Sequence, residues 1–240
     1  MKNSTLDVLN LKEIQGFIFD LDGTLVDTMP SIVSVVIQGL QRHGVQQAST
    51  NLGERLYTQF SGSPLPQGIR MVPTLMARVG RLAGLSRLRT GFFTVETTYR
   101  LRKAYDNAKL FPEVKELLDS LYSTERSLCL VSMGSRKGIM RILKRTGIKD
   151  YFSAIISRDE VKKQKPDPEG YLIAQKAMQI SPSRIVVVGD MPTDILAAKR
   201  AGMLSIAVTS GLATEEWFRS AAKPDILLQS IGALRKILDN

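Results

Sequence analysis

Residues 16–27 read Gly-Phe-Ile-Phe-Asp-Leu-Asp-Gly-Thr-Leu-Val-Asp, a short apolar run that leads directly into acidic residues. Such a run, over residues 16–21, is typical of a buried β-strand. Asp20 and Asp22 are two positions apart, so their side chains project to the same side of an extended chain. Their charges would repel by roughly 4 kcal/mol at an intermediate dielectric, and a divalent cation would relieve that repulsion. A solvated Asp-Gly turn is the alternative explanation.

The rest of the chain alternates similar apolar runs with stretches of helical periodicity. This alternation predicts an α/β fold, a Rossmann-like core whose mostly parallel sheet is flanked by helices. The further strands are expected at 127–131, 154–156, 184–188, 204–208 and 225–228, and the helices at 114–122, 135–145, 169–178 and 193–201.

Residues 28–110 break the alternation and contain no clear strand. Apolar residues recur there at helical spacing, as at Ile32, Val36 and Leu40. This segment holds eleven basic and three acidic residues, so it carries +8 of the total charge of +10. We expect a core domain at 1–27 and 110–240 and an inserted all-helical domain at 28–109. The charge suggests an anionic substrate or partner, although a solvated basic face explains it too.

Composition narrows the chemistry. The 240-residue chain has 43% hydrophobic and 23% charged residues. This is the balance of a folded protein. One cysteine, Cys129, and one histidine, His43, exclude an intrachain disulfide and a site of several Cys or His ligands. Carboxylates and other oxygen ligands suit Mg²⁺. No stretch reaches the roughly 18 apolar residues of a membrane helix, and no secretion signal is evident, so we expect a cytoplasmic protein.

A second pair of acids follows the run 185–188, in Gly189-Asp190-Met191-Pro192-Thr193-Asp194. Asp194 lies one helical turn beyond Asp190 and can face the same way. Helix capping explains one of these acids. It does not explain two acid pairs after two different strands, where ligands bind in open parallel sheets.

Two further residues follow predicted strands. Ser132 comes directly after the strand 127–131 and leads through Met133 and Gly134 into a helix, so its hydroxyl and nearby N–H groups form a potential anion site. Lys165, in Lys165-Pro166-Asp167-Pro168, can reach a phosphate as a point charge. An ordinary N-cap and a solvated lysine are the alternatives for each residue alone.

Taken together, these motifs resemble the haloacid-dehalogenase superfamily, from Asp20-Leu-Asp-Gly-Thr-Leu-Val-Asp27 to the acids at 190 and 194. The resemblance covers residues 16–210. The insertion after the first motif is similar to the C1 helical cap of subclass I of this superfamily. Within that subclass, the chain is similar to phosphoglycolate-phosphatase-like enzymes. The resemblance implies a Mg²⁺-dependent phosphatase of small phosphorylated metabolites that forms an aspartyl-phosphate.

The resemblance also implies a role for each matching residue. Asp20 is the implied nucleophile and Asp22 the general acid and base, while Asp20, Asp22 and Asp190 hold Mg²⁺. Asp194 supports the metal or pairs with Lys165. The implied phosphate-binding residues are Gly23, Thr24, Ser132, Met133, Gly134 and Lys165.

The substrate is less well defined. Residues 61–67, Ser-Gly-Ser-Pro-Leu-Pro-Gln, resemble a substrate loop of such caps, and a plain interhelical loop is the alternative. Arg55 and Arg70 are candidates for binding a second anionic group because they flank that loop. A sugar-phosphate mutase or a pyrophosphatase on the same core remains an alternative function. A nucleic-acid-binding or regulatory protein that uses the basic segment is another, although no nucleic-acid motif is present.

Overall fold

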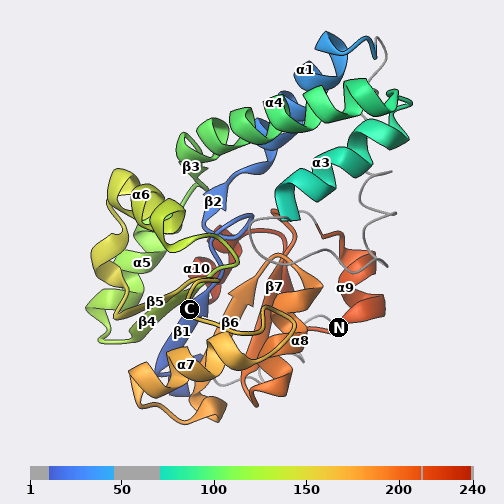
Figure 1. Cartoon of the computed structure of the whole chain (residues 1–240). Helices are drawn as coiled ribbons and strands as arrows, with labels where there is room; N and C mark the ends of the chain where they lie inside the picture. Colours follow the sequence, from blue (N-terminus) through green and yellow to red (C-terminus); the bar gives the residue numbers. More distant parts are fainter. Residues whose placement is uncertain (1–10, 46–70, 212, 239–240) are drawn as a thin grey trace. The chain divides into compact units, whose positions relative to one another are not determined.

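A computed structural model describes residues 11–45, 71–211 and 213–238, and it forms two compact units, residues 1–27 with 109–240 and residues 28–108 (Figure 1). The first is an α/β unit and the second is helical. The α/β unit contains β1 (Gly16–Phe19), β2 (Val26–Asp27), β3 (Lys109–Leu110), α5 (Val114–Ser123), β4 (Ser127–Val131), α6 (Arg136–Thr146), β5 (Ala154–Ile156), α7 (Glu169–Met178), β6 (Ile185–Gly189), α8 (Pro192–Arg200), β7 (Leu204–Val208), α9 (Glu215–Ala221), β8 (Ile226–Leu228) and α10 (Ile231–Leu238).

Six of these strands form one parallel sheet in the order β5-β4-β1-β6-β7-β8. The predicted α/β class is therefore confirmed, and the strands 127–131, 154–156 and 204–208 have the predicted bounds. Strand β1 lies in the middle, with Phe19 in register with Leu130 of β4 and Val188 of β6. The residues that follow these three strands therefore come out at one edge of the sheet.

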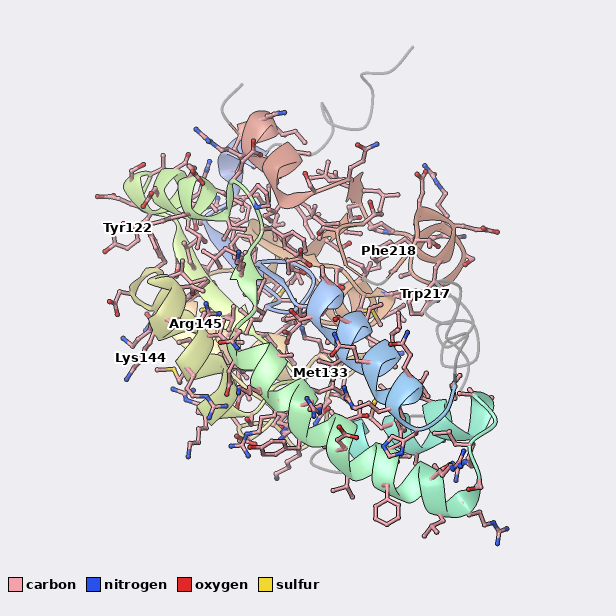
Figure 2. The ribbon with its side chains drawn as sticks, turned by 90° about the horizontal axis from the view of Figure 1, so that it is seen from above. Tyr122, Met133, Lys144, Arg145, Trp217 and Phe218 are labelled. Carbon is pink, nitrogen blue, oxygen red and sulfur yellow. The ribbon has the colours of Figure 1, made fainter. Side chains whose placement is uncertain are left out.

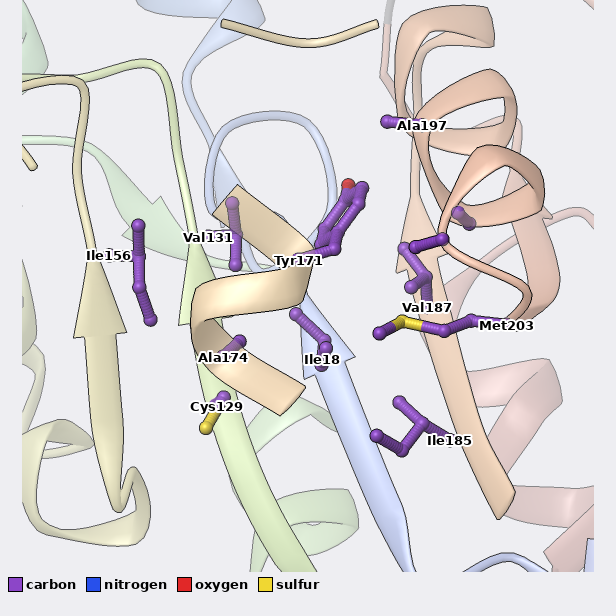
Figure 3. Close-up of a cluster of buried hydrophobic side chains, with 12 residues drawn as sticks. Ile18, Cys129, Val131, Ile156, Tyr171, Ala174, Ile185, Val187, Ala197 and Met203 are labelled. Carbon is purple, nitrogen blue, oxygen red and sulfur yellow. The ribbon is translucent and has the colours of Figure 1, made fainter. Parts of the chain in front are cut away.

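The strands are buried on both faces, which is why they read as continuous apolar runs. Successive side chains alternate between faces, so Ile18 and Cys129 lie on one side of the sheet and Phe17 and Phe19 on the other. Figure 3 shows α7 packing Ala174 against the first of these faces.

Helix α6 shows how local sequence sets an element's ends. Its N-cap, Ser135, accepts a hydrogen bond from the backbone N–H of Gly138 at 3.3 Å. Gly147 ends the helix at a positive φ of 72°, a conformation that glycine adopts without steric cost. Lys144 and Arg145 in its last turn project from the surface (Figure 2), where they face the negative end of the helix dipole. Helix α6 begins and ends one residue later than predicted.

The helical unit contains α1 (Met29–Arg42), α3 (Met71–Leu82) and α4 (Arg87–Asp106), and no strand occurs among its described residues. Its core is built from the inner sides of the three helices. The buried members are Val36, Leu40, Met76, Val79, Phe93 and Leu101. Gly39 lets α1 approach α4 closely, because a Cβ there would come within 2.6 Å of the Thr97 hydroxyl.

The sequence analysis missed one small element. β2 and β3 pair in antiparallel fashion, with Val26 opposite Leu110 and Asp27 opposite Lys109, so Lys109 belongs to the α/β unit rather than to the inserted segment. Two residues per strand are too few to show a periodic pattern. Within the described ranges, no helix has both the length and the apolar character needed to cross a membrane.

Candidate active site

Three neighbouring strands, β4, β1 and β6, each end at a buried polar residue. Ser132 follows β4, Asp20 follows β1 and Asp190 follows β6, and their exposed fractions are 4%, 7% and 3%. The backbone N–H of Asp20 still belongs to the sheet, because it donates to the Val188 carbonyl at 2.9 Å. The sheet therefore brings together residues that lie far apart in the chain.

Lys165 reaches this strand edge from the loop before α7. Its Nζ lies 2.6 Å from Asp20 Oδ1 and 2.6 Å from Asp194 Oδ1, and it donates to the Val131 carbonyl at 2.7 Å. Only 5% of the Lys165 side chain is exposed, so solvent screens these contacts weakly. Lys165 is thus not the solvated lysine that its sequence context also allowed.

Tyr171 is a residue of this network that the sequence analysis did not identify. Its hydroxyl donates to Asp194 Oδ1 at 3.0 Å, while Asp194 Oδ2 accepts the backbone N–H of Met191 at 3.0 Å. The aromatic body of Tyr171 packs in the core beside Ile18 (Figure 3). In the sequence it reads as one more apolar position of α7, and only the fold shows where its hydroxyl points.

The electrostatics follow from one buried cation among several carboxylates. Burial, together with the charges of Asp194 and Asp22, raises the pKa of Asp20 to about 7, although Lys165 acts in the opposite direction. Burial also disfavours the charge on Lys165, but Asp194 and Asp20 outweigh it and raise the Lys165 pKa well above its ordinary value. The site therefore holds excess negative charge that a bound cation would stabilise.

The backbone packs closely against the Asp190 carboxylate. Gly23, at φ 79°, and Gly211 lie so close to the Asp190 carboxylate that a Cβ at either position would overlap it. The Gly23 carbonyl is fixed by the Ser210 hydroxyl, which donates to it at 2.9 Å. Neither Gly211 nor Ser210 was singled out from the sequence, since both lie beyond the recognised motifs.

The oxygen atoms of Asp20, Asp22 and Asp190 fit a hard cation. No group of three His, Cys, Asp or Glu side chains suited to a metal occurs within residues 11–45, 71–211 and 213–238. The set implied by the resemblance needs only the carboxylates of Asp20 and Asp190, because its third ligand is the backbone carbonyl of Asp22. Carboxylate and carbonyl oxygens with waters are the ligands that Mg²⁺ takes.

The remaining predicted residues border the same region. Ser132 Oγ accepts the backbone N–H of Gly134 at 3.1 Å, and Ser132, Met133 and Lys165 line one pocket with the basic Arg158. Such a lining suits an anion.

Two predicted residues of the first motif lie next to the carboxylates. Thr24 is fully buried, and within the described ranges its hydroxyl has no hydrogen-bond partner. Asp22 is half-buried and close enough to Asp20 to raise its pKa. The predicted loop 61–67, Arg55 and Arg70 lie outside the described residues.

Comparison with known protein sequences finds similarity over most of the chain. The family model described as haloacid dehalogenase-like hydrolase matches residues 17–208. A phosphoglycolate phosphatase of Vibrio vulnificus (strain YJ016) is 31% identical over 232 residues, which cover 95% of this chain and 97% of that protein. A phosphoglycolate phosphatase of Escherichia coli O157:H7 is 29% identical over 235 residues, or 93% and 92% of the two chains.

Solved structures share the fold over nearly the whole length. A predicted phosphoglycolate phosphatase of Haemophilus somnus superposes with a TM-score of 0.74 at 25% identity, covering 94% of this chain and 98% of that one. A haloacid dehalogenase-like family hydrolase of Streptococcus pneumoniae gives a TM-score of 0.70 at 21% identity, with coverages of 95% and 99%.

Proposed function

Because the chain belongs to the haloacid dehalogenase-like hydrolase family, we propose that it is a phosphatase that hydrolyses a small phosphomonoester, with 2-phosphoglycolate as the first substrate to test. The observation that carries this proposal is the position of Lys165 between Asp20 and Asp194, both buried. A nucleophilic carboxylate beside a fixed cation is what phosphoryl transfer requires. The likeness to phosphoglycolate phosphatases supports the choice of substrate.

In the first half of the proposed reaction, an Asp20 carboxylate oxygen attacks the phosphorus of the substrate. The bond between phosphorus and the leaving oxygen breaks, and Asp22 gives its proton to that oxygen, so a neutral alcohol departs. Lys165 and the Ser132 hydroxyl donate to the phosphoryl oxygens, where negative charge is spread in a loose transition state. The product of this step is an aspartyl-phosphate on Asp20.

In the second half, Asp22 takes a proton from a water molecule that attacks the same phosphorus. The bond between phosphorus and Asp20 breaks, inorganic phosphate leaves, and both aspartates regain their starting states. Asp194 acts through Lys165, since it shares the Lys165 ammonium group with Asp20. Tyr171 and the Met191 N–H hold the Asp194 carboxylate in place.

The site is proposed to work with Mg²⁺. The carboxylates of Asp20 and Asp190 and the Asp22 carbonyl would hold the ion, and the backbone at Gly23 and Gly211 packs closely against the Asp190 carboxylate. When bound, the ion offsets negative charge on the transferring phosphoryl group. The raised pKa of Asp20 supports this assignment, because an ionised Asp20 needs more positive charge than Lys165 supplies alone.

We also assign residues 28–108 to a cap that selects the substrate. The strong positive charge of this segment supports an anionic substrate, and 2-phosphoglycolate carries a carboxylate besides its phosphate.

The test is phosphate release from 2-phosphoglycolate, sugar phosphates, nucleotides and pyrophosphate, each with Mg²⁺ and with EDTA. We expect release from a small phosphomonoester that needs Mg²⁺ and is lost in Asp20→Asn. The matched control is Asp150→Asn, which changes an exposed aspartate of the same unit. Unchanged turnover by Asp20→Asn would contradict the proposal. Isomerisation of a sugar phosphate without phosphate release would favour a mutase instead.

A further inference from the structure

Four large apolar side chains lie exposed in a row along α4. Leu88, Phe92, Val95 and Tyr99 are 72%, 63%, 73% and 75% exposed, and we call this row the α4 stripe. Single exposed apolar residues are ordinary on a protein surface, but a contiguous apolar patch marks an interaction site. The stripe is independent of the proposed catalytic residues, all of which belong to the α/β unit.

The stripe is not the side of α4 that holds its own unit together. Thr90, Phe93, Thr97 and Leu101 form the buried side of the helix, and Phe93 packs in the core of the helical unit. A helix in a single small unit needs one apolar side, with polar residues on the other. α4 has two, and the second one requires a partner.

The spacing of the stripe indicates another helix. Its members are separated by four, three and four residues, which is the a/d spacing of a helix that packs along a second helix. The strict a/d row is narrow, whereas helices that lie in a membrane surface carry a broader apolar face. Gly91 borders the row, and a Cβ there would meet nothing within 4 Å, so a partner can approach the backbone closely.

We propose that the α4 stripe binds the α4 stripe of a second copy of this chain, with the two helices antiparallel. In this arrangement Leu88 packs on Tyr99 of the second copy, and Phe92 packs on its Val95. A two-fold axis repeats both contacts, because residue i then contacts j while j contacts i. All four layers are apolar, so the stripe is complementary to itself.

Charges beside the stripe favour this register over one that is shifted by a heptad. Glu96 borders the row, and the register brings Arg89 of the second copy to its level. Glu96 is 30% exposed and also contacts Arg42 and Arg100 of its own chain at 2.8 Å. A shift by one heptad would place Phe92 against the charged Arg102. It would also place Arg89 against Lys103, so that two positive charges repel each other. A parallel pair would place Arg102 against its own copy.

The size of the stripe suits a weak dimer. The aromatic side chains of Phe92 and Tyr99 offer about 150–250 Å² each, and with the smaller Leu88 and Val95 the four at these exposures supply roughly 500 Å² per copy. Two copies then bury about 1,000 Å², the least that a specific interface needs. We therefore expect a dimer that dissociates on dilution.

The positive charge beside the stripe distinguishes a second copy of the chain from an acidic partner or a lipid surface. Arg87, Arg89, Arg102 and Lys103 surround the stripe, so an acidic helix or an anionic lipid surface would bind it less tightly as salt rises. Residues 87–106 hold five basic and two acidic residues, so two copies bring net positive charge together despite the Arg89–Glu96 pairs, and their association strengthens with salt. Salt dependence therefore distinguishes a second copy from an acidic partner.

The first experiment is sedimentation velocity of the full chain over a range of micromolar concentrations. We expect a shift from 26.6 kDa to twice that mass, favoured by salt. Phe92→Glu should weaken the association tenfold or more, since it places a charge in both central apolar layers. Tyr122→Glu, at a 60% exposed aromatic of α5, should leave it unchanged (Figure 2 labels Tyr122). Circular dichroism checks that both variants are folded.

The second experiment tests the register by disulfide formation. Leu88→Cys mixed with Tyr99→Cys should form a cross-linked dimer, because position 88 of one copy faces position 99 of the other. Either variant alone should not cross-link, since its cysteine then faces an unchanged residue. Cys129 is fully buried and does not compete. Leu88→Cys mixed with Tyr122→Cys is the matched control.

Three results would overturn the proposal. The first is a chain that stays monomeric at all concentrations and salt levels. The second is a dimer that Phe92→Glu does not weaken. The third is a monomer that co-sediments with phosphatidylglycerol vesicles through the stripe, which would identify a membrane surface. None of these depends on phosphatase activity, so the proposal fails or holds independently of the proposed function.

Discussion

The ammonium group of Lys165 lies 2.6 Å from a carboxylate oxygen of Asp20, although the two residues are 145 positions apart in the chain. The parallel sheet creates this contact by ending β1 beside the loop that carries Lys165. The same ammonium group lies 2.6 Å from Asp194, so one buried cation serves two buried carboxylates. Removing any member leaves the others with uncompensated charge, and this makes the site sensitive to single substitutions.

Lys165→Met should cause the largest loss of stability among changes at this site. It leaves Asp20 and Asp194 facing each other without a cation, at a cost of about 3–5 kcal/mol in unfolding free energy near neutral pH. In the wild type, the Lys165 ammonium group lowers the pKa of Asp20. Its removal therefore raises the pKa of Asp20 further. A group whose folded pKa is raised contributes stability at low pH and loses it as pH rises, so the deficit should shrink toward acid pH.

Urea unfolding of Lys165→Met between pH 5 and 8 measures that deficit. Lys176→Met, at an exposed lysine of α7, is the control. It should change the unfolding free energy by no more than about 0.5 kcal/mol, the usual limit for a surface substitution. A deficit for Lys165→Met that is independent of pH would contradict the shared-cation account. Phosphate release by the same variant should fall at least a hundredfold, since a charged phosphoryl ligand is lost.

Gly23→Ala should disturb Asp190 directly. A Cβ at Gly23 would overlap the Asp190 carboxylate, and the residue also has φ 79°. Gly147→Ala is the matched control, because Gly147 has φ 72° but a Cβ there meets nothing within 4 Å. Both variants should lose about 1–2 kcal/mol from the left-handed backbone. Only Gly23→Ala should also raise the Mg²⁺ concentration for half-maximal activity, by tenfold or more, and equal Mg²⁺ dependence in both would rule out the assigned role of Asp190.

Cys129 should be unreactive in the folded chain. It is fully buried in β4, and burial raises the pKa of its thiol despite a hydrogen bond with Ser153, so little reactive thiolate forms. Labelling with a thiol reagent at pH 8 should therefore proceed only through unfolding, and its rate should rise steeply with urea. Rapid stoichiometric labelling in buffer would show that the sheet opens easily at β4.

Glu96 should make the helical unit sensitive to acid. Slight burial opposes its charge, but hydrogen bonds from His43 and Arg100 and the charge of Arg42 outweigh this and lower its pKa. A depressed carboxyl pKa contributes stability above its unfolded value of 4.5 and loses it as pH falls through the folded value. Each of these partly exposed pairs contributes under about 1 kcal/mol.

The Glu96 prediction is tested by the stability difference between the wild type and Glu96→Gln. This difference should be largest near pH 6 and should shrink below pH 4.5, since the protonated glutamate then resembles glutamine. Glu216→Gln, at an exposed position of α9, should show a much smaller change with pH. A difference that grows toward acid would contradict the assigned contacts.

Much of the α/β unit could be predicted because its strands are buried on both faces. Such strands read as apolar runs, and β4, β5 and β7 have the predicted bounds. The motif residues after the strands are brought together because parallel strands end at one edge. The short pair β2 and β3 escaped prediction because two residues carry no period.

The contacts that complete the site depend on tertiary packing, which the sequence pattern does not contain. Tyr171 reads as a core aromatic of α7, and only packing brings its hydroxyl to Asp194. Gly211 lies beside Asp190 only because β7 is next to β6 in the sheet. The second apolar side of α4 is hidden in sequence because apolar residues on two opposite sides blur the helical period.

The proposed nucleophile can be tested directly by trapping. The chain is mixed with 2-phosphoglycolate and Mg²⁺, quenched within the first turnover and reduced with borohydride, which converts an aspartyl-phosphate to homoserine. We predict homoserine at position 20, dependent on substrate, and neither trapping nor phosphate release in Asp20→Asn. Phosphate release by the wild type that persists in Asp20→Asn, or homoserine at another aspartate, would contradict the mechanism.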